Sequence, residues 1–394
     1  MLEHQFDQQI DRRHTNSAKW HQYPADVLPM WVADMDFSAP QPIVDALIER
    51  SRHGIFGYEF PTDSIREQIS CWLLQRHGWD VSPEAILPLP GVVSSLALVT
   101  RLFCRPGDAA VTLTPAYPPF LSVPAGQGLS VISVPLAQSA DGWRLRYEID
   151  FNALQQALSE PRATMFIHCH PHNPTSREWS AAENQRIAQL CAEHDVLIVS
   201  DEIWADLTLA QHQHRPFALQ CTEAADRCIT LMAPSKAFNI PGLGFSFAVV
   251  THPVLRRRLQ AALFGNLPHI TIFGLLAAQA AYSDPACAAW LDALRAYLTA
   301  NRDFALAYIA QHLPTLRATV PEATYLLWID CSDAAVTRPF QFFLQQGKVA
   351  LSDGVTFGPG YERFVRLNFG CPRAQLREAL ERMRAALISA TVRG

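Results

Sequence analysis

The sequence predicts an α/β protein with a mostly parallel sheet, in which a larger lobe precedes a smaller one. Between about residues 83 and 250, short apolar or β-branched runs alternate with longer amphipathic runs, as in a sheet flanked by helices. The 394 residues exceed what one compact core usually holds. A long helical pattern near residue 290 then leads into further strand-like runs. We therefore expect two lobes, with an active site between them.

The larger lobe contains six strand candidates. They are residues 109–112, 131–134, 164–169, 196–200, 229–232 and 245–250. Between the third and the fourth, Ser180 and Glu183 have the spacing of a capping box, and Ile187, Leu190 and Cys191 follow at helical spacing. This order of strand, loop, helix and strand is typical of a parallel sheet.

The smaller lobe begins with a helical pattern at residues 290–313, which has Leu291, Leu294 and Leu298 on one stripe. Strand-like runs follow at 325–329 and 364–369, and a closing helix is expected at 375–388. The expected domains are an N-terminal segment at 1–45 that packs with the small domain, a large domain at 46–287 and a small domain at 288–394.

Composition and charge exclude several classes of protein. Apolar residues make up 49% of the chain and charged residues 18%, which is typical of a globular enzyme. The net charge is -5, and no run of Lys and Arg is long enough to bind nucleic acid or an anionic membrane. Nine scattered cysteines without a Cys-x-x-Cys pair indicate neither a disulfide framework nor a zinc site. Because no apolar stretch reaches about 18 residues and the terminus lacks an apolar signal region, we expect a soluble cytoplasmic protein.

Lys236 is the most informative residue of the chain. It lies among small, turn-forming residues at 233–243, directly after the strand candidate 229–232. Lysine is the side chain that forms an imine with an aldehyde cofactor, and pyridoxal 5'-phosphate then serves as the electron sink for carbanion chemistry. A Ser-Lys pair in a loop is usually a solvated surface pair. The prediction therefore depends on the other parts of such a site.

Two polar residues at strand ends meet needs of this cofactor. Asp201 follows the apolar strand 196–200, where open α/β sheets bind ligands, and could hold a pyridine nitrogen protonated. By itself, Asp201 could equally be a helix cap. Asn173 lies in a proline-stiffened turn at 170–175 and could donate to the ring oxygen and touch a substrate carboxylate. As a bare motif, Asn-Pro is a common turn.

A phosphate cradle is expected at residues 90–95, which lead into a helical pattern at 95–103. The free amides and the dipole of a helix start bind anions well. Ser235 and Tyr58 could add hydroxyl donors.

Two further residues are candidates for contacts with the ring and the substrate. Tyr117 follows the strand 109–112 and could stack on the ring, or could be a core tyrosine. Arg366 lies inside the apolar run 364–369, and a buried arginine needs a partner such as a bidentate carboxylate. That carboxylate could belong to an amino-acid substrate.

Four segments carry a resemblance to a known family. They are residues 29–37 (PMWVADMDF), 53–58 (HGIFGY), 171–175 (PHNPT) and 233–239 (APSKAFN). Over essentially its whole length, the chain resembles fold-type I pyridoxal-phosphate enzymes of the aminotransferase class I/II superfamily, most closely the MalY/PatB-type cystathionine β-lyases (C-S lyases). The resemblance implies a large domain with a mostly parallel seven-stranded sheet flanked by helices, plus a smaller α+β domain. It also implies a homodimer with shared active sites.

The resemblance implies a role for each site residue. Lys236 carries the cofactor and acts as general base, Asp201 pairs with the ring nitrogen and Tyr117 stacks on the ring. Further cofactor contacts are implied for Val92, Val93, Asn173, Trp204, Ser235 and, from the neighbouring subunit, Tyr58. Substrate contacts are implied for Arg366, Asn173 and Ala33.

The expected reaction is α,β-elimination from cystathionine or a similar cysteine S-conjugate to pyruvate, ammonia and a thiol. Transamination, a specialised biosynthetic reaction on an unusual amino acid and a cofactor-retaining binding protein remain alternatives. The chain departs from the family pattern at His170, Ser176, Trp204 and Gly244, which affects the choice of substrate more than cofactor binding.

A metal site is a further alternative that the sequence raises. His168, His170 and His172 alternate along a strand end and could share a face. Because no further ligand motif supports them, no metal is expected.

Overall fold

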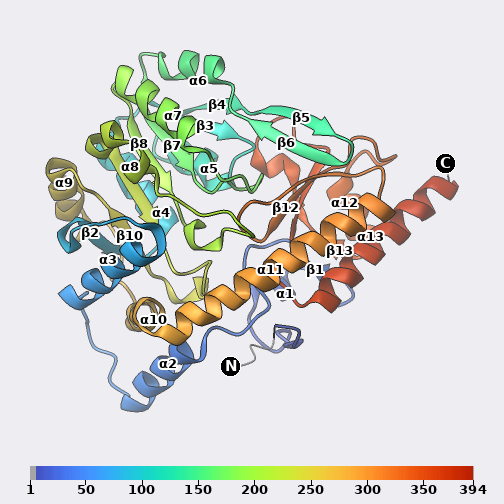
Figure 1. Ribbon diagram of the computed structural model, residues 1–394, viewed down its shortest axis with the longest axis horizontal. Coiled ribbons are helices and arrows are strands. Elements are labelled where there is room, and N and C mark those ends of the chain that lie inside the picture. Colours follow the sequence, from blue (N-terminus) through green and yellow to red (C-terminus); the bar gives the residue numbers. More distant parts are fainter. Residues whose placement is uncertain (1–5, 394) are drawn as a thin grey trace.

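A computed structural model describes residues 6–393 and shows two main sheets with helices packed around them (Figure 1). The first five residues of the expected N-terminal segment, and Gly394, lie outside the described residues. No helix in the described range is both long and apolar enough to cross a membrane.

The larger sheet has seven strands in the order β2-β10-β9-β8-β7-β3-β4. Their bounds are β2 (Ile86–Leu89), β3 (Ala109–Thr114), β4 (Ser130–Pro135), β7 (Ala163–Cys169), β8 (Leu197–Asp201), β9 (Cys228–Met232) and β10 (Ser246–Val249). Only β10 runs antiparallel to its neighbours, so the expected mostly parallel seven-stranded sheet is confirmed. Each of the six predicted strands overlaps one of these, whereas β2 was missed.

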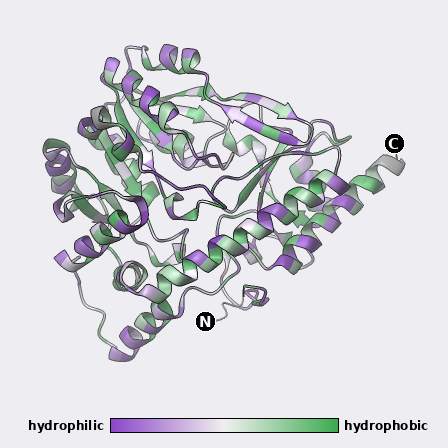
Figure 2. Ribbon diagram, viewed as in Figure 1, coloured by the Kyte–Doolittle hydropathy of each residue, from purple (hydrophilic) through white to green (hydrophobic). Residues whose placement is uncertain are grey.

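Helices cover both faces of this sheet. They are α2 (Gln41–His53), α3 (Asp63–His77), α4 (Val92–Phe103), α5 (Pro118–Gly126), α6 (Phe151–Leu158), α7 (Ala181–Glu193), α8 (Phe217–Gln220), α9 (Pro253–Leu263) and α10 (Ile272–Ser283). In β7, Phe166 packs in the hydrophobic cluster that contains α6 and α7, whereas Met165 and Ile167 pack in the cluster that contains α4 and α5. Burial on both faces explains why these strands are hydrophobic throughout (Figure 2).

The predicted capping box begins α7. Ser180 Oγ accepts a hydrogen bond from the Glu183 amide at 3.3 Å, and Glu183 Oε2 accepts one from the Ser180 amide at 2.8 Å. The two bonds satisfy amides that a helix start otherwise leaves unpaired. Here a local sequence signal predicted the helix start correctly.

The second sheet has six strands in the order β14-β15-β12-β11-β6-β5. Their bounds are β5 (Ala137–Asp141), β6 (Arg144–Glu148), β11 (Arg317–Thr319), β12 (Leu326–Asp330), β14 (Ser352–Asp353) and β15 (Phe364–Asn368). The helices that follow the large sheet along the chain are α11 (Pro285–His312), α12 (Pro339–Gln345) and α13 (Arg373–Arg393). Strands β5 and β6 come from the range expected for the large domain, and the domain limits at 45 and 287 stay a prediction.

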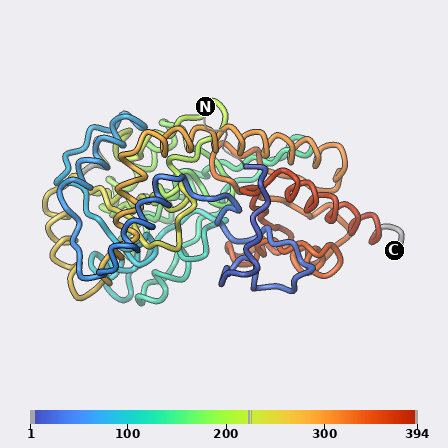
Figure 3. The backbone as a smooth tube through the Cα atoms, turned by 90° about the horizontal axis from the view of Figure 1, so that it is seen from below, coloured from blue at the N-terminus to red at the C-terminus, as the bar shows by residue number. Residues whose placement is uncertain are grey.

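The N-terminal segment packs against the C-terminal part of the chain. It contains α1 (Ala18–His21) and β1 (Leu28–Pro29), and β1 pairs in parallel with β13 (Val349–Ala350). Figure 3 shows the blue N-terminal trace beside the red C-terminal segments. This pairing brings residues 29–37 to the end of the large sheet where β7 and β8 finish.

Candidate active site

A cavity of about 830 Å³ opens where β3, β7, β8 and β9 end. Residues of the N-terminal segment, β14 and β15 complete its walls. The predicted site residues that line it are Ala33, Val92, Val93, Tyr117, Asn173, Asp201, Trp204, Ser235, Lys236 and Arg366. Tyr58 does not line it, because its side chain is 88% exposed elsewhere on the surface.

Lys236 lies in the turn after β9, and its ammonium is held by two neighbours. Nζ donates a hydrogen bond to the Ala33 carbonyl at 2.7 Å and lies 5.6 Å from the centre of the Trp204 ring. Burial, together with the nearby charge of Arg366, lowers the pKa of Lys236 to about 8. About a tenth of the amine is therefore uncharged at pH 7, far more than for an ordinary lysine, and this uncharged form is the nucleophile or general base.

Asp201 ends β8 as a buried carboxylate without an ion-pair partner in the described part of the chain. Its Oδ1 accepts one hydrogen bond, from the Ile203 amide at 3.1 Å. Burial raises its pKa to about 7, because the Ile203 hydrogen bond and the charge of Lys236 offset only part of the lost hydration. A protonated ring nitrogen would supply the missing positive charge.

Arg366 is the complementary case, a buried guanidinium that contacts no carboxylate. Nη1 donates to Asn173 Oδ1 at 2.9 Å, and Nη2 donates to the Trp31 carbonyl and to Ser352 Oγ, both at 3.1 Å. Its Nε is buried without a hydrogen-bond partner in the described structure, and burial lowers the pKa to about 10. The site therefore lacks an anion, which a substrate carboxylate would provide. Because Asn173 Oδ1 faces Arg366, the Asn173 amide nitrogen remains as its donor.

Helix α4 supplies the anion cradle. Gly91 is its N-cap, so the amides of Val92, Val93 and Ser94 have no acceptor within the helix. The predicted helical pattern started only at residue 95, and the helix itself starts at Val92. Across the cradle, Gly244 has φ of +70°, a left-handed conformation that glycine adopts without the strain of a side chain.

Tyr117 and Trp204 provide aromatic surfaces in the cavity. Tyr117 is the N-cap residue of α5, and its ring meets Phe120 edge-on at 5.5 Å. The buried Trp204 meets Tyr325 edge-on at 4.8 Å, and Tyr325 Oη donates to the Ala33 carbonyl at 3.0 Å. Trp204 thus lies beside both Lys236 and the tyrosine that binds the Ala33 carbonyl.

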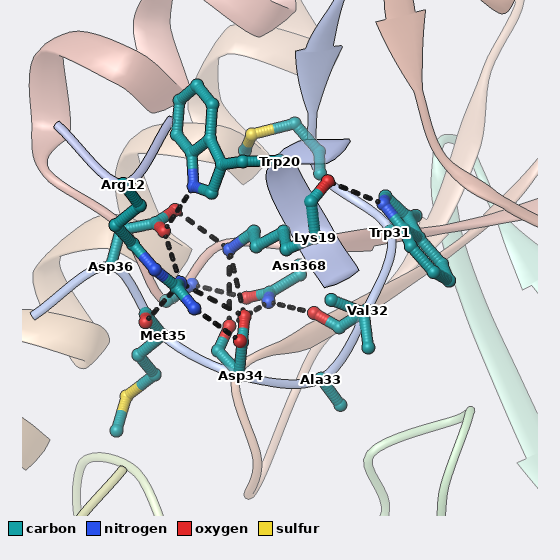
Figure 4. Close-up of polar contacts among 12 residues, drawn as sticks. Arg12, Lys19, Trp20, Trp31, Val32, Ala33, Asp34, Met35, Asp36 and Asn368 are labelled. Atoms are coloured by element: carbon teal, nitrogen blue, oxygen red, sulfur yellow. Dashed lines mark hydrogen bonds and ion pairs between the residues drawn. The ribbon is translucent and has the colours of Figure 1, made fainter. Parts of the chain in front are cut away.

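Residues 29–37 are held over the cavity by the N-terminal charge cluster, which consists of Arg12, Lys19, Asp34 and Asp36 (Figure 4). Lys19 is 1% exposed, and its Nζ donates to Asp36 Oδ2 at 2.8 Å. Arg12 bonds both carboxylates at 2.8 Å. The charge and hydrogen bond of Lys19 lower the pKa of Asp36, although burial alone would raise it.

Two asparagines connect the same segment to the motifs around it. Asn239 binds the backbone of Met35 at 2.8 Å and 2.9 Å, and Asn368 Nδ2 donates to the Val32 carbonyl at 2.7 Å. These contacts explain why residues 29–37 and 233–239 occur together. They present the Ala33 carbonyl to Lys236 and the Trp31 carbonyl to Arg366.

The departures near residue 170 have structural explanations. Ser176 has φ of +60°, which glycine would tolerate more easily, and its Oγ is held by Thr324 Oγ1 and the Leu326 carbonyl, both at 2.8 Å. The three histidines raised as a metal set do not converge on one point. His168 bonds Asn184 at 3.0 Å, and His172 bonds Thr175 at 2.7 Å.

His170 instead belongs to a buried cluster with Glu178 and His214, whose candidate ligand atoms lie within 4.8 Å of one another. His214 donates to Glu178 at 2.8 Å and to Glu202 at 2.7 Å. Burial opposes a charge on His214, but the two carboxylates outweigh it and raise the pKa to about 10. A proton therefore lies between His214 and Glu178. The charged group of His214, Glu178 and Glu202 supports the segment that begins with Asp201.

Sequence reasoning missed several residues that line the cavity. They are Tyr23, Trp31, Phe340, Ser352, Asp353 and Phe357. Trp31 lies in a motif that had been recognised and could have been found there. Tyr23 and Asp353 had no sequence signal, because they reach the cavity only through the pairing of β1 with β13 and of β14 with β15.

The donor set fits pyridoxal 5'-phosphate, the cofactor that the resemblance implies. An amine with a lowered pKa, a buried carboxylate without an ion-pair contact in the described structure and a helix start with free amides all border one cavity. Each lacks the partner that the cofactor offers, namely an aldehyde, a ring nitrogen and a phosphate.

Comparison with known proteins supports the resemblance. The family described as aminotransferase class I and II matches residues 25–383. Cystathionine beta-lyase PatB of Bacillus subtilis is 42% identical and is aligned over 97% of this chain and 99% of its own. Protein MalY of Escherichia coli is 33% identical over 98% of both chains. The crystal structure of the PLP-bound C-S lyase from Staphylococcus hominis is 32% identical, with a TM-score of 0.90 over 97% of this chain and 98% of that one.

Proposed function

Because the chain belongs to the aminotransferase class I and II family, we propose that it is a pyridoxal-phosphate C-S lyase that acts on cystathionine or similar cysteine S-conjugates. One substrate molecule and one water give pyruvate, ammonia and a thiol. The observation that carries this proposal is the set of three ionisable groups, Lys236, Asp201 and Arg366, that border one cavity without an ion-pair partner in the described structure.

The residues divide the task of binding among them. Arg366 binds the α-carboxylate of the amino acid through its free guanidinium edge, and Asn173 keeps that guanidinium in place. The first-turn amides of α4, with Ser235, hold the phosphate. Asp201 holds the ring nitrogen protonated, and Tyr117 lies against the ring.

Lys236 is the general base. Bound pyridoxal phosphate supplies a ring that accepts the electrons of the α-carbon. Lys236, with a pKa of about 8, takes the α-proton, and the hydrogen bond to Ala33 together with the ring of Trp204 keeps its Nζ in the cavity. The bond between the β-carbon and sulfur then breaks, and its electron pair leaves with the thiolate.

A Lys236→Ala variant tests this function. We expect it to lose both the visible absorbance of the bound cofactor and the release of pyruvate from cystathionine. Lys348→Ala, at a half-exposed surface lysine, is the matched control and should keep both. Pyruvate release by the native protein without any keto acid supports the lyase, whereas strict dependence on a keto acid would show transamination instead.

The exposed apolar side chains around Tyr58 support a homodimer with shared sites. Ile55, Phe56, Tyr58, Phe60 and Phe264 are between 56% and 88% exposed, and such a cluster is unusual on a monomer. In this proposal they form the subunit contact, and Tyr58 reaches the phosphate in the neighbouring site.

Mixing two inactive variants tests the shared site. Lys236→Ala homodimers and Tyr58→Ala homodimers each have two defective sites, but a heterodimer has one intact site. Random exchange of subunits should therefore restore about a quarter of the native activity. No recovery, despite subunit exchange confirmed by mass spectrometry, would contradict the arrangement.

The compartment is proposed from the cysteines. None of the nine forms a disulfide in the described structure, and all except Cys71 are buried. Such a pattern favours a reducing compartment such as the cytoplasm, and fractionation of the source cells would test it.

A further inference from the structure

The cavity contains one carboxylate to which the proposed reaction gives no task, that of Asp353. Asp353 lies in β14, which pairs with β15 so that Ser352 is opposite Arg366. Ser352 Oγ accepts from Arg366 at 3.1 Å, so Asp353 is one residue away from the group that binds the α-carboxylate. Asp353 is therefore placed to meet the part of a substrate that extends beyond its α-carbon.

The charge of Asp353 has no cationic partner in the described structure. Its one hydrogen bond within the protein comes from the Val355 amide, which donates to Oδ1 at 3.3 Å. Partial burial raises the pKa of this carboxyl group, since no neighbouring cation offsets the lost hydration. A ligand with a positive charge would find this carboxylate available.

Aromatic side chains stand around the same region. Tyr23 and Trp31 meet edge-on at 5.9 Å, and Phe340 and Phe357 line the cavity with them. Aromatic faces beside a carboxylate are a recurrent way to bind an ammonium group.

The cleft continues past Asp353 into a second hollow of about 330 Å³. Asp353 and Phe340 border both spaces, and Arg338 lines the second. Arg338 forms one long hydrogen bond, to Gln341 at 3.5 Å, and no ion pair in the described residues. Beyond Arg366, the charged groups that line the cleft are thus an anion at Asp353, a cation at Arg338 and a second anion at Glu362. The Glu362 carboxylate accepts from the Gly360 amide at 3.2 Å.

We propose that Asp353 and Arg338 form a leaving-group subsite that binds the ammonium and carboxylate of a second amino-acid group. The cation at Arg366, the anion at Asp353 and the cation at Arg338 complement a thioether that joins two amino acids, and a simple S-alkylcysteine would leave the subsite unused. This inference rests on the proposed C-S lyase function and narrows it to thioethers in which the sulfur joins two amino acids, with cystathionine as the example.

The test compares two substrates in the holoenzyme. Asp353→Asn keeps the hydrogen bond to Val355, because asparagine caps helix starts as well as aspartate does, but it removes the charge. We expect the ratio of kcat/KM for cystathionine to kcat/KM for S-methylcysteine to fall about tenfold or more, as charged hydrogen bonds of this kind imply. Arg338→Gln should lower the same ratio, and Asp333→Asn, whose partner is Arg317 outside the cleft, should leave it unchanged.

Two outcomes separate this inference from the proposed function. If Asp353→Asn lowered kcat/KM equally for both substrates, the subsite would be refuted and the proposed lyase function would stand. Failure of the native protein to release pyruvate from either substrate would refute the lyase. In that case, the dissociation constants of cystathionine and S-methylcysteine are measured by calorimetry for the native protein and for Asp353→Asn. If the substitution changed both dissociation constants equally, the subsite would be refuted.

Discussion

Replacing Lys19 with methionine tests whether the N-terminal charge cluster holds residues 29–37 over the active site. The ammonium of Lys19 and the carboxylate of Asp36 are 2.8 Å apart, and their side chains are 1% and 2% exposed. Removal of one partner from a buried ion pair leaves the other charge uncompensated and costs about 3 to 5 kcal/mol. Because Arg12 still bonds Asp36 at 2.8 Å, we expect the lower end, about 3 kcal/mol of unfolding free energy.

Urea unfolding followed by circular dichroism measures this loss, and an exposed pair provides the control. Arg13 pairs with Asp11 at 3.0 Å, but the two side chains are 56% and 43% exposed. Arg13→Met should therefore cost much less unfolding free energy than Lys19→Met. If the two variants lost equal stability, the buried cluster would not be the anchor that its geometry indicates.

The same variant should also change catalysis and the response to acid. A loosened segment moves the carbonyls of Ala33 and Trp31 away from Lys236 and Arg366, so KM should rise. The pKa of Asp36 is lowered on folding from its usual value of 3.8, so its contribution is present above that pH and is lost as the pH falls through the folded pKa. Lys19→Met should reduce this loss of stability in acid.

Three further results are expected. Folding raises the pKa of His214 from 6.5 to about 10, so the stability that its charge contributes is complete below pH 6.5 and is lost towards pH 10. The difference in unfolding free energy between the native protein and His214→Gln should therefore shrink over that range. A constant difference would contradict the assigned charge. The rate at which the apoprotein takes up pyridoxal phosphate, measured by absorbance, should rise with pH and level off above about pH 8. The reason is that only the uncharged Lys236 amine attacks an aldehyde. A rate that continued to rise up to pH 10.5 would indicate an ordinary lysine. Arg366→Lys should raise KM about tenfold or more, since lysine cannot form the bidentate contact with a carboxylate, and an unchanged KM would exclude Arg366 from substrate binding.

Features that depend on neighbours in the chain could be read from the sequence. The apolar runs of β7, β8 and β9 predicted buried strands, and Ser180 with Glu183 predicted the start of α7. The exact residues at which helices start were harder to predict from the sequence. Helix α11 begins at Pro285, five residues ahead of the predicted start, because Asp284 caps it by accepting from the Ala286 amide at 2.8 Å.

By itself, the sequence determined the large sheet and the chemical types that line the site, because strand periodicity and the polar residues after strand ends are local patterns. Only the tertiary structure decided which groups meet. The contact of Lys236 with Ala33 spans 203 positions and that of Arg366 with Asn173 spans 193. Such contacts depend on how the sheets and segments pack, and so do the positions of Asp353 and Arg338 along one cleft and the exposure of Tyr58. The physical reason is that burial and charge interactions between distant parts of the chain decide which packing is most stable.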